Sequence, residues 1–416
     1  DFIQFSKRDD SQVKFKTGGG KELPLFPQKK FRINIDKEAV YANGVVDISD
    51  SATVVDYIDW NWKANVITKR DLMVIDLIAN NNWERPIYFS ITVGNSPKSY
   101  FWLNDYFRLE GMAYRFVPQF SPSKNPQGID FGHVDTDIMF ENLLNKFEYG
   151  NMELPDVYLD ETNRRLSYNL RTIFGRLANE LVIEGKNDKA IEALDFAMEK
   201  MPVEKFGYNY FIFGIISSYT QAGEVQKAED LVNRYAESLD QEAAFFNSFK
   251  DRGRIKSEMS SVNSLYYGLI QMKDAIRRQK ISTLNRNLSE FEFTSERSMD
   301  VNQLAIEMIP SDWYMLMDFL QNPSNNPLGQ SNPVNTRKNQ KLIEAIVKEM
   351  IDAKLITQKK VQQLPAQQRR LMVHEYLFDN LSEVTKNSYS NWQSEVTALN
   401  ADLNLFIQDY QRVIAN

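Results

Sequence analysis

The sequence contains no cysteine and only two histidines, His133 and His374. The absence of cysteine excludes disulfides, thiolate metal sites and cysteine nucleophiles. A multi-histidine metal centre would use almost the whole supply of histidine, and histidine-based catalysis has few candidates. We therefore expect no cofactor.

The sequence also lacks a dense basic run and a long apolar one. Its 416 residues carry 49 basic and 56 acidic side chains, a net charge of −7. The electrostatic footprint of a nucleic-acid-binding protein is missing, so we expect no nucleic acid partner. No apolar stretch approaches the roughly 20 residues that span a bilayer. The chain begins with Asp1 instead of Met, and we expect it to be excised from a longer protein.

Two stretches have the spacing of helical hairpins of tetratricopeptide type. Their turn glycines, Gly185 and Gly223, lie 223 − 185 = 38 residues apart, and so do Ala190 and Ala228 (228 − 190 = 38). A regular array repeats at about 34 residues, so roughly four extra residues fall in the connection at residues 203–207. The positions expected to be buried are Phe174, Leu177, Ala178, Leu181, Ala190, Leu194 and Ala197 in the first hairpin, and Ile212, Ile215, Ile216, Tyr219, Ala228, Val232 and Tyr235 in the second.

An α/β part precedes the repeats. Alternating apolar residues predict strands at 31–35 and 39–48, and β-branched and aromatic residues predict strands at 87–93 and 113–117. Helical patterns lie at 68–78, where Thr68 opens a capping box, at 101–109 and at 137–147. The alternation of helix and strand indicates an α/β layer with parallel neighbours.

The part after the repeats is predicted to be helical. Apolar residues at helical spacing in residues 255–279 indicate a third, degenerate repeat. Further helices are predicted at 338–355, 366–381 and 392–414, where they could cap the array. We thus expect an α+β chain that is mainly α, divided as follows: an irregular segment 1–30, an α/β domain 31–150, repeats 151–290, and a helical region 291–416 with a Pro- and Asn-rich linker at 321–335.

Two sets of candidate site residues lie in the α/β part. Trp83, Arg85 and Tyr88 stand where a helix leads into a strand, and they could contact a sugar or peptide. The alternative is structural, with Trp83 as a plug and the arginine stacked or paired beneath it. His133, Asp135 and Asp137 alternate along the chain and form a weak metal-site candidate. Its alternative is that Asp135 or Thr136 caps the following helix while His133 is solvated.

A third set lies on the repeats. The first helix of each hairpin lines the concave face, which in repeat proteins commonly binds peptides. The outward positions there are Thr172, Gly175, Asn179, Tyr210, Phe213 and Ser217. Packing of Tyr210 and Phe213 under the third repeat or the C-terminal helices is the alternative. These positions predict a protein or peptide partner.

Four ordered motifs carry a resemblance that covers roughly residues 31–240. They are Thr68-Lys-Arg-Asp-Leu72, Asn81-Asn-Trp-Glu-Arg-Pro-Ile-Tyr-Phe89, Tyr106-Phe-Arg-Leu-Glu-Gly-Met-Ala-Tyr-Arg-Phe-Val-Pro118, and Asp156-Val-Tyr-Leu-Asp160 followed by Arg164 and Arg171. The chain resembles the C-terminal soluble region of a bacterial family of multi-pass membrane proteins related to class C glycosyltransferases of the protein O-mannosyltransferase kind. The resemblance implies a membrane-embedded parent, with this region on the periplasmic face of the inner membrane. It carries over no catalytic residue, because the membrane segments are not in this sequence.

Taken together, these patterns favour a non-catalytic, extracytoplasmic accessory region of a membrane-anchored, glycosyltransferase-like protein. Its work would be to bind a protein partner or a glycan acceptor. The alternative is a self-contained hydrolase or transferase with a site near Trp83, Arg85 and His133, and a third option is an assembly scaffold. A cleft with His133 beside two carboxylates would favour the enzyme.

Overall fold

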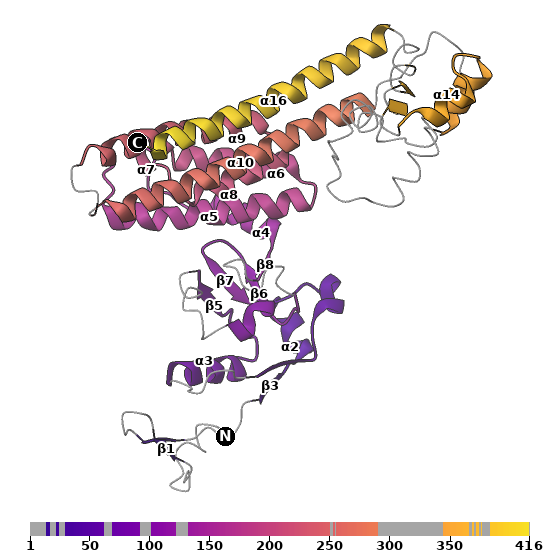
Figure 1. Cartoon of the computed structure of the whole chain (residues 1–416). Helices are drawn as coiled ribbons and strands as arrows, with labels where there is room; N and C mark the ends of the chain where they lie inside the picture. The colour runs from indigo at the N-terminus through magenta and orange to yellow at the C-terminus, as the bar shows by residue number, and fades with distance from the viewer. Residues whose placement is uncertain are drawn as a thin grey trace. The chain divides into compact units, whose positions relative to one another are not determined.

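The computed structural model describes residues 14–16, 22–24, 30–61, 69–91, 101–121, 132–249, 253, 255–289, 344–365, 368–369, 372–373, 376 and 383–415. It is mainly helical, with small sheets confined to the N-terminal part, as the sequence predicts (Figure 1). The chain forms two compact units, Asp1–Ala222 and Gly223–Asn416. The division falls at the turn of the second predicted hairpin, so its two helices belong to different units.

The first described strands form two antiparallel ribbons. One pairs β1 (Lys14–Lys16) with β2 (Glu22–Pro24), and the other pairs β3 (Lys30–Asn34) with β4 (Tyr57–Asn61). The predicted strand at 31–35 is thus confirmed, with a shift of one residue.

The predicted strand at 39–48 is wrong. Residues Lys37–Ala42 form helix α2, and a 3-10 helix, η1, follows at Ile48–Thr53. The side chain of Asp36 caps α2, because its Oδ1 accepts a hydrogen bond from the Ala39 backbone N at 3.1 Å. A local cap of this kind outweighs the alternation of apolar residues on which the strand prediction rested.

A four-stranded sheet forms the centre of the α/β part. Its strand order is β5 (Tyr88–Ser90), β7 (Ala113–Phe116), β6 (Phe107–Leu109), β8 (His133–Val134). Only β6 and β8 pair in parallel, and the other pairs are antiparallel. The expectation of parallel neighbours is therefore wrong for most of the sheet. The connection from β6 to β7 is too short for a crossover and permits only a hairpin.

Helical segments flank this sheet. Helix α3 (Lys69–Asn80) lies where a helix is predicted, while its expected capping residue Thr68 lies outside the described residues. The predicted helix at 101–109 is a 3-10 helix, η2 (Phe101–Tyr106), that runs directly into β6. After β8 come α4 (Thr136–Glu141) and the π-helical turn η3 (Asn142–Lys146), which together match the helix predicted at 137–147.

The first predicted hairpin is present as α5 (Glu161–Ile183) and α6 (Asn187–Lys200), which pack on one another. All the positions expected to be buried in it are fully buried. Gly185 turns the chain with a φ of +75°, a conformation that glycine adopts without strain. The extra residues of the connection form a one-turn helix, α7 (Val203–Phe206), before α8 (Ile212–Ala222).

The added turn at α7 is held by a buried arginine. The guanidinium of Arg171 on α5 is fully buried and donates hydrogen bonds to the carbonyl oxygens of Gly207 at 2.7 Å and Met201 at 3.0 Å. Tyr168, one turn earlier, donates to the carbonyl oxygen of Phe206 at 3.2 Å. Helix α5 therefore satisfies the backbone of the longer connection, which would otherwise bury unpaired carbonyls.

Helices α5 and α8 approach closely at a pair of glycines. A Cβ built on Gly175 would lie 3.3 Å from the backbone carbon of Gly214, whereas a Cβ on Gly214 would meet nothing within 4 Å. The hydroxyl of Ser218 donates to the Gly175 carbonyl oxygen at 3.2 Å across the same crossing. Small residues at a crossing let the two backbones come together.

The second unit is built on three packed helices: α9 (Val225–Asn247), α10 (Lys256–Ser289) and α16 (Glu383–Ala415) (Figure 1). The third repeat predicted at 255–279 is not a hairpin, because α10 runs unbroken for 34 residues. Its apolar stripe packs against α9 and α16, so no turn is needed to bury it. Helix α16 contains the predicted helix 392–414.

Other C-terminal predictions are described only in part. Residues 344–352 are helical within the predicted helix 338–355, and a short helix α14 (Gln358–Gln363) follows. The linker at 321–335 lies outside the described residues, as does most of the predicted helix 366–381.

Candidate functional site

A cavity of about 410 Å³ lies within the first unit, where the sheet meets the helices. Helix α5 lines it along one face, with Thr172, Gly175, Arg176, Asn179, Glu180 and Ile183. Helix α8 and the residues before it contribute Tyr210, Phe211, Phe213, Gly214, Ser217 and Ser218, and the α/β part contributes Ser121, Gly132, His133 and Val134. All the concave-face positions predicted from the repeats, including Asn179, Tyr210, Phe213 and Ser217, thus line one cavity.

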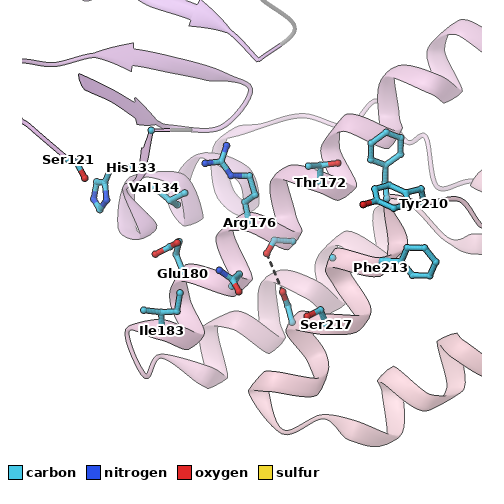
Figure 2. A pocket seen from close by; sticks show the side chains of 16 residues that line it. Ser121, His133, Val134, Thr172, Arg176, Glu180, Ile183, Tyr210, Phe213 and Ser217 are labelled. Atoms are coloured by element: carbon cyan, nitrogen blue, oxygen red, sulfur yellow. Dashed lines mark hydrogen bonds between the residues drawn. The ribbon is translucent and has the colours of Figure 1, made fainter. Parts of the chain in front are cut away.

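The cavity changes in chemical character along its length. Figure 2 shows the aromatic rings of Tyr210 and Phe213 at one end and the side chains of His133 and Glu180 toward the other. The two rings meet edge to face with centroids 5.5 Å apart, and Tyr210 is 68% exposed. An exposed aromatic pair beside polar groups is typical of recognition surfaces, because the rings offer apolar area at a low cost in side-chain entropy.

The cavity lining includes a side-chain oxygen with unused hydrogen-bonding capacity. The hydroxyl Oγ1 of Thr172 is shielded from solvent and has no hydrogen-bond partner among the described residues. A buried hydroxyl without a partner is costly, and a ligand that bonds to it would recover that cost. Thr172 therefore marks where a polar ligand group would be received.

Contacts from the α/β part hold β8 and α4 against α5. The hydroxyl of Thr136 donates to Glu184 Oε2 at 2.7 Å. Lys189 and Lys186 approach Asp137 at 3.2 and 3.4 Å, and their hydrogen bonds hold the pKa of that carboxyl below its ordinary value. Arg176 donates to the Tyr114 hydroxyl at 2.7 Å, which ties a cavity-lining side chain to the sheet.

The candidate metal residues do not converge. Asp135 caps α4, with its Oδ1 accepting from the Ile138 backbone N at 3.0 Å, and Asp137 faces the two lysines on the α6 side. His133 is exposed and lines the cavity. Within the described part of the chain, no three His, Asp or Glu side chains are grouped to hold a metal ion. The cavity lining contains one carboxylate residue, Glu180, together with His133. The enzyme hypothesis expected two carboxylates beside this histidine.

The residues Trp83, Arg85 and Tyr88 lie away from the cavity. Trp83 is buried with a φ of +61° and stacks on Phe116, with ring centroids 5.4 Å apart and planes 20° apart. Arg85 is exposed. The burial and stacking of Trp83 agree with the plug interpretation of that residue.

Tyr88 belongs to a polar row across the sheet. The strand register places Tyr88, Arg115, Arg108 and His133 as successive cross-strand neighbours. The buried carboxylate of Glu110 accepts from the Tyr88 hydroxyl at 2.9 Å and from Arg108 Nη2 at 2.6 Å. Burial and then the Glu110 carboxylate raise the pKa of Tyr88. In this network two arginines, Arg108 and Arg115, face the single carboxylate of Glu110. Of its members, only His133 lines the cavity.

Several cavity-lining residues were missed by the sequence patterns. Arg176, Glu180 and Ile183 extend the face of α5 that begins at Thr172 by helical steps of three and four residues, so a wider stripe would have included them. Ser121, Gly132 and Val134 line the cavity because of where β8 pairs with the sheet. No local sequence pattern predicts that pairing.

Fold and cavity together define a mainly helical α+β chain in which an N-terminal mixed-sheet part joins a tetratricopeptide-like hairpin. Residues 1–138 match the family model described as TMEM260-associated domain 2. TMEM260 is a membrane protein family. The match spans 138 of the 416 residues, ends within α4 and leaves out the helical hairpins. No curated protein and no solved structure is significantly similar to the chain.

None of the described helices combines the length and the hydropathy that a helix needs to cross a bilayer.

Proposed function

We propose that this chain is a non-catalytic, extracytoplasmic accessory region of a membrane-anchored, glycosyltransferase-like protein, and that it binds a protein partner through the cavity between α5, α8 and β8. The family match at residues 1–138 supports the link to a membrane protein. The periplasmic location and the glycosyltransferase-like parent follow from the resemblance of the four sequence motifs.

The observation that carries the binding proposal is the gathering of the concave-face residues around one cavity of about 410 Å³. That volume is within the range of pockets that hold a small ligand or a short peptide segment. An extended peptide suits the lining, because an aromatic side chain or proline would pack on Tyr210 and Phe213 while backbone groups bond to Thr172 and Asn179. A glycan acceptor is the alternative ligand, since aromatic, amide and hydroxyl groups also suit a sugar.

The composition of the lining favours binding over catalysis. An enzyme needs convergent titratable groups, with a base within hydrogen-bond reach of a nucleophile or a second acid. The lining offers His133 and Glu180 as its histidine and carboxylate, and Arg176 is engaged with Tyr114. The hydrolase or transferase hypothesis near Trp83, Arg85 and His133 is the weaker proposal, because Trp83 is buried in the core.

The experiment introduces a larger side chain at a glycine that lines the cavity. Gly214 lines the cavity, and a Cβ there meets nothing within 4 Å. Peptides are selected from a displayed random library against the full chain, and their affinity is measured by titration calorimetry. Gly214→Leu is expected to weaken binding at least about tenfold, because the leucine occupies the ligand's volume.

The matched control is Glu192→Leu, an exposed helical position on α6 that does not line the cavity. It is expected to leave the affinity unchanged. Selected peptides that bind Gly214→Leu as tightly as the unmodified chain would show that the cavity is not the binding site. Binding of an oligosaccharide, and of no peptide, would transfer the proposal to a glycan acceptor. Turnover of either ligand by the chain would overturn the non-catalytic assignment.

A further inference from the structure

The two glycines at the crossing of α5 and α8 differ in what requires them. Gly175 has to be a glycine, because a Cβ there would lie 3.3 Å from the backbone carbon of Gly214. A Cβ on Gly214 would meet nothing within 4 Å, and its φ is outside the left-handed region. Neither packing nor backbone conformation therefore requires a glycine at position 214. Since Gly214 lines the cavity, its missing side chain leaves space for a ligand.

The hydroxyl of Thr172 differs from those of the buried serine and threonine residues on α5 and α8. Ser167 and Thr220 donate to the carbonyl oxygens four residues earlier, at 3.0 and 2.8 Å, and Ser218 donates to the Gly175 carbonyl oxygen. Thr172 Oγ1 is also shielded from solvent, but it has no hydrogen-bond partner among the described residues. It lines the cavity, and a hydroxyl can both donate and accept.

Thr172 and Gly214 lie within one helical turn of the same level of the α5–α8 pair. The rings of Tyr168 and Phe211 stack with centroids 6.3 Å apart, and they are 43 residues apart in the chain (211 − 168 = 43). The hydrogen bond at the crossing joins residues with the same separation (218 − 175 = 43). The two helices therefore run in parallel, and Thr172 lies level with the residue after Gly214. We call the space between them the Thr172–Gly214 niche.

The aromatic pair Tyr210 and Phe213 lies close to this niche along the chain. Tyr210 precedes Gly214 by four residues, about 6 Å at the rise of a helix. Two residues of an extended peptide span about 6.6 Å, and side chains two positions apart point to the same side. A peptide with a ring on the aromatic pair would therefore present the residue two positions away to the niche.

We infer that the cavity selects extended peptides in which a proline or aromatic residue and a glycine or alanine are separated by one residue. The ring packs on Tyr210 and Phe213, and the small residue enters the Thr172–Gly214 niche. Its main-chain amide bonds to the Thr172 hydroxyl, since that amide offers both a donor and an acceptor without charge. This inference depends on the proposed function, because it specifies the ligand of the same cavity.

The first test sequences the peptides that the displayed random library yields against the full chain. We expect a ring-bearing residue, any residue and a small residue to be enriched at this spacing, in either chain direction. Thr172→Val keeps the shape of the side chain and is expected to weaken binding about tenfold, through the lost hydrogen bond. It is also expected to raise the urea midpoint of the free chain, because a methyl group replaces an unpaired hydroxyl. The control is Thr162→Val, at an exposed position on α5 outside the cavity lining, which is expected to leave the affinity unchanged.

The second test narrows the niche by one methyl group with Gly214→Ala. The affinity of a selected peptide with alanine at the small position is expected to fall about tenfold, because the two methyl groups compete for the same space. The same peptide with glycine at that position is expected to lose less than about twofold in affinity. Equal losses for the two peptides would overturn the inference.

Two further outcomes separate this inference from the proposed function. Peptides whose binding is weakened by Gly214→Leu, but which show neither the predicted spacing nor sensitivity to Thr172→Val, would overturn the inference and leave the proposed function standing. A library that yields no peptide for the cavity would overturn both. A lower urea midpoint for Thr172→Val would show that the hydroxyl is already bonded in the free chain, which would also overturn the inference.

Discussion

The buried guanidinium of Arg171 makes a sharp test of how the longer connection between α6 and α8 is stabilised. Replacement by methionine keeps a long, flexible side chain in the same space and removes both hydrogen bonds to the carbonyl oxygens of Met201 and Gly207. The substitution therefore isolates the polar contribution. It leaves the apolar neighbours of the side chain in place.

The size of the effect follows from the contacts. A hydrogen bond from a charged group contributes about 1.5–3 kcal/mol, and the two lost bonds leave two carbonyls unsatisfied. The loss is partly offset because methionine no longer buries a charge. We expect the free energy of unfolding of the first unit to fall by about 2–4 kcal/mol. The free energy of unfolding of Arg171→Lys is expected to lie between those of the unmodified chain and Arg171→Met, since one ammonium cannot bond to both carbonyls in the same geometry.

The assay is hydrogen exchange followed by mass spectrometry, combined with urea denaturation. It reports the first unit separately, since exchange resolves the amides of α5 to α8 from those of the second unit. The control is Arg164→Met, an exposed arginine on the same helix. If Arg171→Met loses no more protection from hydrogen exchange than Arg164→Met, the proposed stabilisation of the connection by Arg171 is refuted.

The remaining predictions concern three other contacts. Gly175→Ala is expected to destabilise the first unit by about 1–3 kcal/mol by forcing α5 from α8, while Gly214→Ala is neutral or stabilising by up to about 1 kcal/mol, as measured by urea unfolding. Trp83→Ala is expected to cost about 3–5 kcal/mol and Arg85→Ala less than about 0.5 kcal/mol, and equal effects in the same assay would contradict a structural role for Trp83. Burial raises the pKa of the Glu229 carboxyl, but hydrogen bonds from two lysines outweigh it and lower the pKa below the ordinary value. The ionised carboxylate therefore stabilises the second unit at pH values above its ordinary pKa. This contribution is lost as the pH falls through the lower pKa that the carboxyl has in the folded state. Glu229→Gln should cost about 1–3 kcal/mol at pH 7 and nothing in acid, and a difference from the unmodified chain that persists in acid would contradict the ion pairs.

The helical hairpin could be predicted from the sequence because its signals are local. Small residues at fixed helical spacing, such as Ala178 and Ala190, specify which faces meet, and Gly185 specifies the turn. The concave face follows from the same periodicity, which places Thr172 and Asn179 on it. The extra residues between the hairpins could be counted, but their folding into α7 depends on Arg171, whose role as a buried donor leaves no pattern.

The α/β part was less predictable because its strands are short and pair at a distance. In residues 39–48 the alternating apolar residues favour a strand. The side chain of Asp36 instead stabilises a helix there, because it caps the first turn. The two-residue strand β8 is defined by its pairing with β6, and no run of that length has a recognisable period. The position of His133 beside the cavity follows from that pairing and could not be read from its neighbours in the chain.

The bond between Arg176 and Tyr114 has a thermodynamic consequence. It joins a side chain of the cavity wall to the sheet, so the two parts of the first unit share one set of lining atoms. Any molecule held between His133 and Tyr210 would lock strand and helix together and raise the melting temperature of both. By the same reciprocity, loosening the sheet at Tyr114 would lower affinity in a cavity that the tyrosine does not line.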